Sequence, residues 1–201
     1  MGALLIRRRR PMGEPPSSSA SAWPFVTTIA GTAGAGRICV VLAELGVTLD
    51  PLRQAVIDPA ASPGELDAFD LGDRFDTIVL GSHLLNLPDE PARSAFVRAA
   101  ARHAMAGARI FLEHHPIDWA ETAEAVRPTP GGSELGMVDV RRDPPFVSAV
   151  SVYDLGGRIV RQPFTARVLS EAELDQTLSG SGLKRRVRLS PTWLEATLRT
   201  A

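Results

Sequence analysis

Apolar and polar positions in the middle of the chain follow the order strand, helix, strand. Residues 76–81 read Asp-Thr-Ile-Val-Leu-Gly, a pattern typical of a strand that is buried on both faces of a sheet. In residues 88–105 apolar side chains recur at helical spacing, and Gly107 is placed to end that helix. Residues 108–113 predict the next strand. This order indicates a βαβ unit with parallel strands.

The chain before this unit predicts a second unit of the same kind. Residues 25–30 are rich in apolar and β-branched side chains and favour a strand, and residues 31–36 contain only Gly, Ala and Thr and favour a tight turn. Residues 37–45 then predict a helix that ends at Gly46. Their central apolar run would also suit a strand, but a helix completes the βαβ unit. We further expect short strands at residues 47–49 and 54–57 and a loop at residues 58–64.

Past Pro116 the pattern changes to short strand-like segments, which we interpret as an antiparallel insert or edge. Ser170 and Glu173 have the spacing of a capping box that opens a helix, and Gly180 or Gly182 would end it. The strand-like segments are residues 138–140, 146–153 and 158–166, and residues 185–198 predict one or two closing strands.

The length of the chain indicates one ordered domain with a tail. A chain of 201 residues suits a single α/β domain, which we place at residues 23–201. Residues 1–22 contain the run Arg7–Arg10 followed by Pro and Ser. This composition predicts a disordered tail, although a transit peptide has a similar one.

Composition and charge argue against several classes of partner. The net charge is −1 with 22% charged residues, so nothing indicates nucleic acid as a partner. No apolar run approaches the roughly 18 residues that a membrane-spanning helix needs, and no membrane partner is expected. Cys39 is the only cysteine. A chain that cannot form an internal disulfide is expected in the reducing cytoplasm.

Two features of the N-terminal half are candidates for ligand binding, because ligands of open parallel sheets bind at the carboxyl ends of the strands. The turn at residues 31–36 would let a ligand approach the backbone, and the helix after it would offer free N–H groups, but small-residue turns after strands are also common without a ligand. Asp50 follows a predicted strand and could accept hydrogen bonds from the two hydroxyls of a ribose. Because Asp50 precedes a proline, a plain surface turn is the better explanation of this residue taken alone.

The strand ends at residues 81 and 113 are followed by histidines. His83 would project from the first strand tip or pack on the core, and Asn86 would project with it or cap the turn before Pro88. His114 and His115 follow the second strand. Adjacent residues on a strand point to opposite faces, so we expect no metal site there. A general base is the better interpretation, since the pKa of histidine suits proton removal near neutrality.

Three stretches of the chain resemble the class I methyltransferases that use S-adenosylmethionine (SAM), in particular small bacterial ones. They are the segment Asp70–Asp89 with its Gly81-Ser82-His83, residues 100–113, and the later stretch around Tyr153, Phe164–Arg167 and Glu173-Leu174. The resemblance implies an α/β, Rossmann-like, mostly parallel sheet with flanking helices and an antiparallel C-terminal strand or hairpin. It also implies methyl transfer from SAM to a small molecule, by alignment of donor and acceptor and by proton removal.

The resemblance assigns roles to individual positions. His114 or His83 would be the base. Gly34 and Gly36 would face the methionine part of the cofactor and Asp50 its ribose, and Gly31 and Thr32 of the same turn would also bind the cofactor. Glu65, Leu66 and Asp67 would lie near the adenine, and Gly81, Ser82 and His83 would line the floor of the site.

Three departures from the family keep two other hypotheses open. Ala30 stands where the family usually has an acidic residue, Thr32 stands in place of the first glycine of the motif, and the interval from Gly36 to Asp50 is short for the family. These departures fit a degenerate, non-catalytic methyltransferase-like protein. A nicotinamide-dependent oxidoreductase is the third hypothesis, but Tyr153 lacks the lysine four positions later that the short-chain type requires, since position 157 is Gly.

Overall fold

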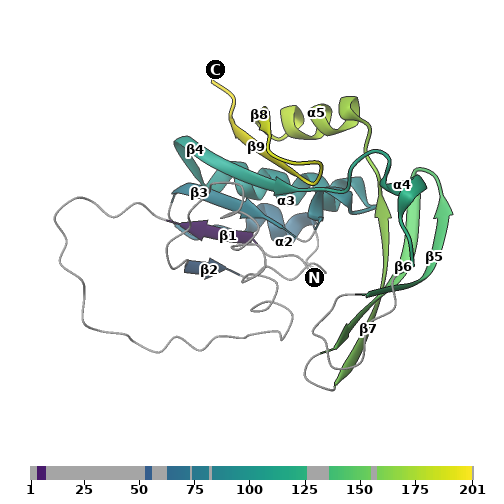
Figure 1. Ribbon diagram of the computed structural model, residues 1–201. Coiled ribbons are helices and arrows are strands. Elements are labelled where there is room, and N and C mark those ends of the chain that lie inside the picture. The colour runs from purple at the N-terminus through teal and green to yellow at the C-terminus, as the bar shows by residue number, and fades with distance from the viewer. Residues whose placement is uncertain are drawn as a thin grey trace.

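A six-stranded sheet flanked by helices and a separate three-stranded antiparallel sheet make up the computed structural model in Figure 1. The structure describes residues 4–7, 53–55, 63–72, 74–81, 83–125, 136–154 and 158–200. None of the helices in this part of the chain combines the length and the apolar character that a membrane crossing requires.

The larger sheet has the strand order β2-β1-β3-β4-β9-β8. β3 and β4 are parallel, whereas β1 is antiparallel to both of its neighbours and β9 is antiparallel to both of its own. It follows that β2, β3, β4 and β8 run in one direction. This arrangement confirms the predicted α/β fold with an antiparallel C-terminal hairpin. The strands are β1 (Leu4–Arg7), β2 (Arg53–Ala55), β3 (Phe75–Leu80), β4 (Ala104–Glu113), β8 (Leu183–Arg188) and β9 (Trp193–Leu198).

The strand β1 lies within residues 1–22, for which the sequence predicts a disordered tail. Its backbone pairs with β2 on one side and with β3 on the other, where Leu4 lies opposite Leu80. Four residues of the expected tail thus belong to the sheet. The predicted strand at residues 25–30, the glycine-rich turn, the helix and the strand that follow it, and Asp50 lie outside the described residues.

Alternate residues of the central strands form the main core with three helices on one face of the sheet. The helices are α2 (Pro63–Ala68), α3 (Glu90–His103) and α5 (Glu171–Gly180), and they cover Ile78, Leu80, Ile110, Leu112, Leu194 and Ala196. Val79 and Phe111 lie at the intervening positions and are also fully buried. β3 and β4 are therefore buried on both faces, as the apolar run at residues 76–81 predicts.

The helix α3 ends four residues before the glycine that was expected to end it. Asp89 caps its start by accepting a hydrogen bond from the Ala92 N–H (2.8 Å). At the other end Ala104 is already extended and pairs with Phe75, so β4 begins directly after the helix. Gly107 instead has a φ of +78° within β4, where the pairing with β3 is irregular. The left-handed backbone of Gly107 therefore belongs to a bulge in β4 and does not end α3.

The helix α2 starts inside a segment that the sequence assigns to a loop. Pro63 is its first residue and Glu65 lies in its first turn, and both residue types favour the start of a helix. That signal is weaker than the turn-forming composition of residues 58–64.

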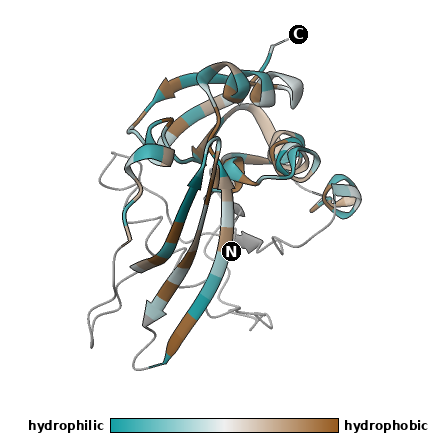
Figure 2. Cartoon of the chain, turned by 90° about the vertical axis from the view of Figure 1, so that its right-hand side faces the viewer, coloured by the Kyte–Doolittle hydropathy of each residue, from teal (hydrophilic) through white to brown (hydrophobic). Residues whose placement is uncertain are grey.

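The predicted antiparallel insert is the three-stranded sheet β5-β6-β7. Hydrophilic and hydrophobic residues are interspersed along these strands in Figure 2. The short helix α4 (Trp119–Thr122) packs against the sheet through a small core of Ala120, Ala123, Val147 and Val168. The strands are β5 (Gly136–Asp143), β6 (Phe146–Asp154) and β7 (Ile159–Arg167).

Candidate functional site

The carboxyl ends of the parallel strands β3 and β4 bring two sequence-distant histidines together. Past β3 the chain turns at His83, whose φ of 55° and ψ of 33° lie in the left-handed region, and enters a single 3-10 turn, η1 (Leu84–Asn86). Past β4 it continues to His114 and His115. This edge is where ligands of open α/β sheets bind.

Three aromatic side chains are stacked at this edge, and we call His83, His115 and Trp119 the ring stack. The centroids of His83 and His115 are 3.8 Å apart with 13° between the ring planes. Those of His115 and Trp119 are 3.6 Å apart with 8° between the planes. Phe164 of β7 approaches Trp119 at 6.4 Å. The ring stack therefore lies at the junction of the two sheets.

Glu113, the last residue of β4, lies beside His83 of the ring stack. Its Oε1 is 3.6 Å from Nε2 of His83. Burial lowers the pKa of His83, and the neighbouring carboxylate only partly offsets this effect, so the imidazole is neutral near pH 7. Nδ1 of His83 is buried and has no hydrogen-bond partner among the described residues, whereas Nε2 faces Glu113.

His114 is buried and is not part of the ring stack. Arg188 donates a hydrogen bond to its Nε2 (2.8 Å), and its Nδ1 is 2.9 Å from the carbonyl oxygen of His115. Arg188 is held in turn by Glu171 (2.5 Å). Since arginine can only donate, Nε2 is the acceptor and Nδ1 carries the proton. Burial lowers the pKa of His114, and both ring nitrogens are engaged within the protein.

Within the described residues, no group of three or more His, Cys, Asp or Glu side chains could hold a metal ion.

The structure places the residues that the resemblance assigns to the cofactor in different surroundings. Gly81 is buried at the end of β3, next to His83. Leu66 is 1% exposed in the main core, and Asp67 pairs with Arg98 of α3 (2.8 Å). Glu65 is exposed on α2. Ser82, Gly31, Thr32, Gly34, Gly36 and Asp50 lie outside the described residues.

The helix α2 is held against the C-terminal half of α3. Besides the pair with Asp67, Arg102 donates hydrogen bonds to the carbonyl oxygens of Leu66 (2.7 Å) and Phe69 (2.9 Å). This half of α3 leads directly into the start of β4, whereas the ring stack lies past the end of β4. The helix α2 and the ring stack are therefore at opposite ends of β4.

Sequence reasoning missed Glu113, Trp119 and Phe164 as members of the site. Glu113 and Trp119 flank the two histidines in the sequence, so the same strand end would have indicated them. Phe164 had no such signal, because the packing of β7 beside α4 is a tertiary contact.

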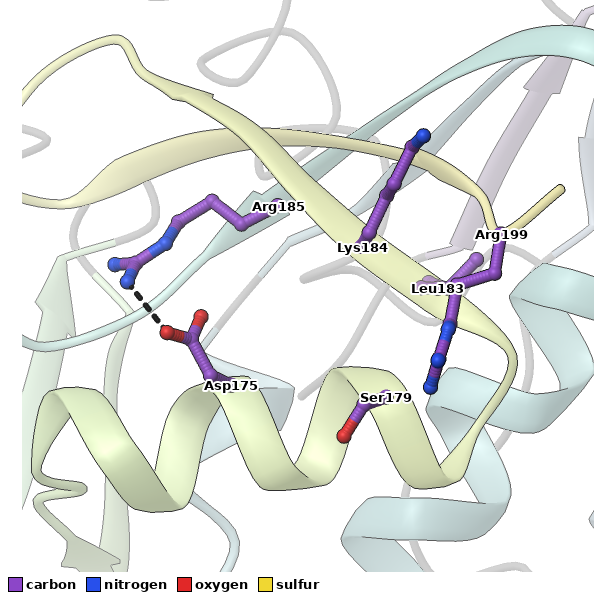
Figure 3. A pocket seen from close by; sticks show the side chains of 6 residues that line it. All are labelled: Asp175, Ser179, Leu183, Lys184, Arg185 and Arg199. Atoms are coloured by element: carbon purple, nitrogen blue, oxygen red, sulfur yellow. Dashed lines mark hydrogen bonds and ion pairs between the residues drawn. The ribbon is translucent and has the colours of Figure 1, made fainter.

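A hollow of about 480 Å³ lies on another part of the surface, between α5 and β8 (Figure 3). It is open and lined by charged side chains, among which Arg185 pairs with Asp175 (2.8 Å). Its lining residues on β8 lie at the start of the strand, whereas Arg188, which contacts His114, is the last residue of β8.

The described fold is similar to that of solved SAM-dependent methyltransferases. A methyltransferase of this kind from Clostridium acetobutylicum matches with a TM-score of 0.55 and 13% sequence identity, over 83% of this chain and 70% of the other. The chain has the fold of the class I methyltransferases.

Two further methyltransferase structures match with lower scores. The sugar N-methyltransferase KedS8 from Streptoalloteichus matches with a TM-score of 0.49 and 19% identity, over 80% of this chain and 67% of the other. The methyltransferase CcbJ from Streptomyces caelestis matches with a TM-score of 0.45 and 20% identity, over 68% and 65%. No protein-family model and no curated protein matches the chain. The chain thus spans between 65 and 70% of the length of these three methyltransferases.

Proposed function

We propose that this chain transfers a methyl group from SAM to a small molecule at the carboxyl edge of β3 and β4. The observation that carries the proposal is the pairing of His83 with Glu113, 3.6 Å apart, at this edge of a class I methyltransferase fold.

The described residues fit a cationic cofactor of this kind. SAM, when bound, supplies an electrophilic methyl group on a positively charged sulfur. The carboxylate of Glu113 and the faces of aromatic rings both favour a nearby cation. We propose that Gly34 and Gly36 contact the methionine part of SAM and that Asp50 contacts its ribose. These three residues lie outside the part of the chain that the structure describes.

His83 would act as the general base. With SAM bound, the imidazole would accept the proton that the acceptor atom loses when it takes the methyl group. Glu113 stabilises the imidazolium that results, because it lies 3.6 Å from Nε2. Of the two candidate bases, we propose His83 and not His114, since both nitrogens of His114 are already engaged.

A non-catalytic methyltransferase-like protein is the second candidate, and the orientation of β1 favours it. β1 occupies the place next to β3 but runs antiparallel to it. Its carboxyl end therefore lies at the opposite edge of the sheet from those of β3 and β4. A ligand at the ring stack would therefore receive no contact from the carboxyl end of β1, the strand beside β3.

Calorimetric titration of the whole chain with SAM and with its demethylated product, S-adenosylhomocysteine, distinguishes the two candidates. The proposal predicts saturable heat with both ligands, and NAD serves as the control that gives none. Absence of heat with either adenosyl ligand at millimolar concentration would contradict SAM binding. In that case the double variant Ala30→Glu, Thr32→Gly is the next protein to titrate, because the degenerate candidate predicts that restoring these residues strengthens binding.

A further inference from the structure

Asn86 is buried at a point where three elements meet, and the mechanism above gives it no part. It is the last residue of η1 and only 2% exposed. One neighbour is the chain past β4, and the other is Arg167, the last residue of β7.

The amide of Asn86 bridges these two segments with two hydrogen bonds. Its Oδ1 accepts from the backbone N–H of His115 (2.7 Å), and its Nδ2 donates to the carbonyl oxygen of Arg167 (2.9 Å). Backbone groups cannot exchange the roles of donor and acceptor, so the two partners fix the orientation of the amide. An aspartate would lack the donor and a leucine would lack both groups. Asparagine is therefore the residue type of this size that satisfies both partners.

These bonds hold His115 from one side while His114 holds it from the other. The Nδ1–H of His114 is directed at the carbonyl oxygen of His115 (2.9 Å), and the backbone N–H of His114 donates to the carbonyl oxygen of Thr192 (2.9 Å). With its backbone fixed at both peptide groups, His115 has its ring placed between those of His83 and Trp119.

We propose that Asn86 is a positioning residue for this site: it fixes His115, and through the ring stack it fixes the imidazole of His83. The catalytic consequence rests on the proposed function. The placement of the rings does not, because it follows from hydrogen bonds within the chain. Asn86 touches no reacting atom and acts only through its neighbour.

The variant Asn86→Leu tests this inference, because leucine has a similar volume and offers neither hydrogen bond. The readout is the NMR titration of the His115 ring. Burial in the ring stack, together with the nearby His83 and His114, lowers the pKa of His115 to about 2. We expect no titration of this ring above about pH 5 in the wild type and titration shifted toward the ordinary value of about 6.5 in the variant.

The matched control is Thr165→Val, which removes the hydrogen bond between the Ser148 and Thr165 hydroxyls (2.8 Å) in the three-stranded sheet. This bond does not involve the ring stack, so the titration of His115 should stay as in the wild type. A folded Asn86→Leu protein whose His115 still does not titrate above about pH 5 would overturn the inference.

A second measurement uses the wild type and does not depend on whether the variant folds. The side-chain NH₂ of Asn86 should exchange slowly with solvent, because it is buried and donates to Arg167. Exchange as fast as that of an exposed asparagine would overturn the inference. Both readouts are independent of SAM, so a chain that binds no SAM would refute the proposed function while the histidine titration still decides the role of Asn86.

Discussion

At the scale of single residues, the site depends on histidines that stay neutral. Burial lowers the pKa of His83, His114 and His115, and for His115 it does so to about 2. In the unfolded chain each titrates near 6.5. Below that value the unfolded state binds more protons than the folded state, so the free energy of unfolding falls as the pH falls.

This linkage predicts a steep loss of stability between pH 7 and pH 5. Each histidine that stays neutral in the folded state contributes a loss of roughly 1.4 kcal/mol per pH unit below about 6.5. Carboxylates titrate lower, so this window reports mainly on histidine. Urea unfolding at several pH values measures the slope. His115→Phe keeps a ring in the stack but removes one titrating group, so it should show a shallower slope, and equal slopes for the two proteins would refute the assignment.

The residue scale is also where the sequence was least informative. It located His83 and His114 correctly at strand ends, because strand ends follow from local apolar patterns. It could not decide which of them keeps a free nitrogen. That choice is made by Arg188, which is far from His114 in the sequence and reaches it only after β8 and β9 have formed. The same limit applies to Asn86, whose partner Arg167 belongs to another sheet.

At the scale of elements, local signals predicted most helices and strands. The capping box at Ser170 is present as expected: its hydroxyl accepts from the Glu173 N–H (3.2 Å), and the Glu173 carboxylate accepts from the Ser170 N–H (2.8 Å). The Ser170 N–H and hydroxyl, which both donate to the Glu173 carboxylate, together with the ion pair to Arg167 lower the pKa of Glu173 to about 2. Where prediction failed, a long-range contact decided the outcome. Pairing of Ala104 with Phe75 ended α3 before Gly107 could.

The capping box gives a prediction for α5. Ser170→Ala should lower the free energy of unfolding by about 1 kcal/mol, because it leaves the Glu173 N–H without its partner. Ser179→Ala is the control on the same helix, since its hydroxyl bonds only to the Gln176 carbonyl at the exposed end. Chemical unfolding of both variants makes the comparison. Equal losses would show that the cap has no special role in the stability of α5.

At the scale of the whole molecule, two sheets and their junction make the site. The larger sheet provides the strand ends that carry His83 and Glu113, and the smaller sheet brings Phe164 against Trp119. The sequence predicted both sheets as separate patterns but not that they meet at these rings, because an apolar pattern shows which face is buried and not against what. The orientation of β1 beside β3 was equally hidden.

The most direct test of the account follows the four histidine rings by NMR while S-adenosylhomocysteine is added. Three of the rings (His83, His114 and His115) lie at the carboxyl ends of β3 and β4. The fourth, His103, is fully buried at the end of α3, where β4 begins, and serves as an internal control. The account predicts saturable shifts that are largest at His83 and absent at His103. Unchanged spectra, or shifts at His103 without shifts at His83, would contradict it.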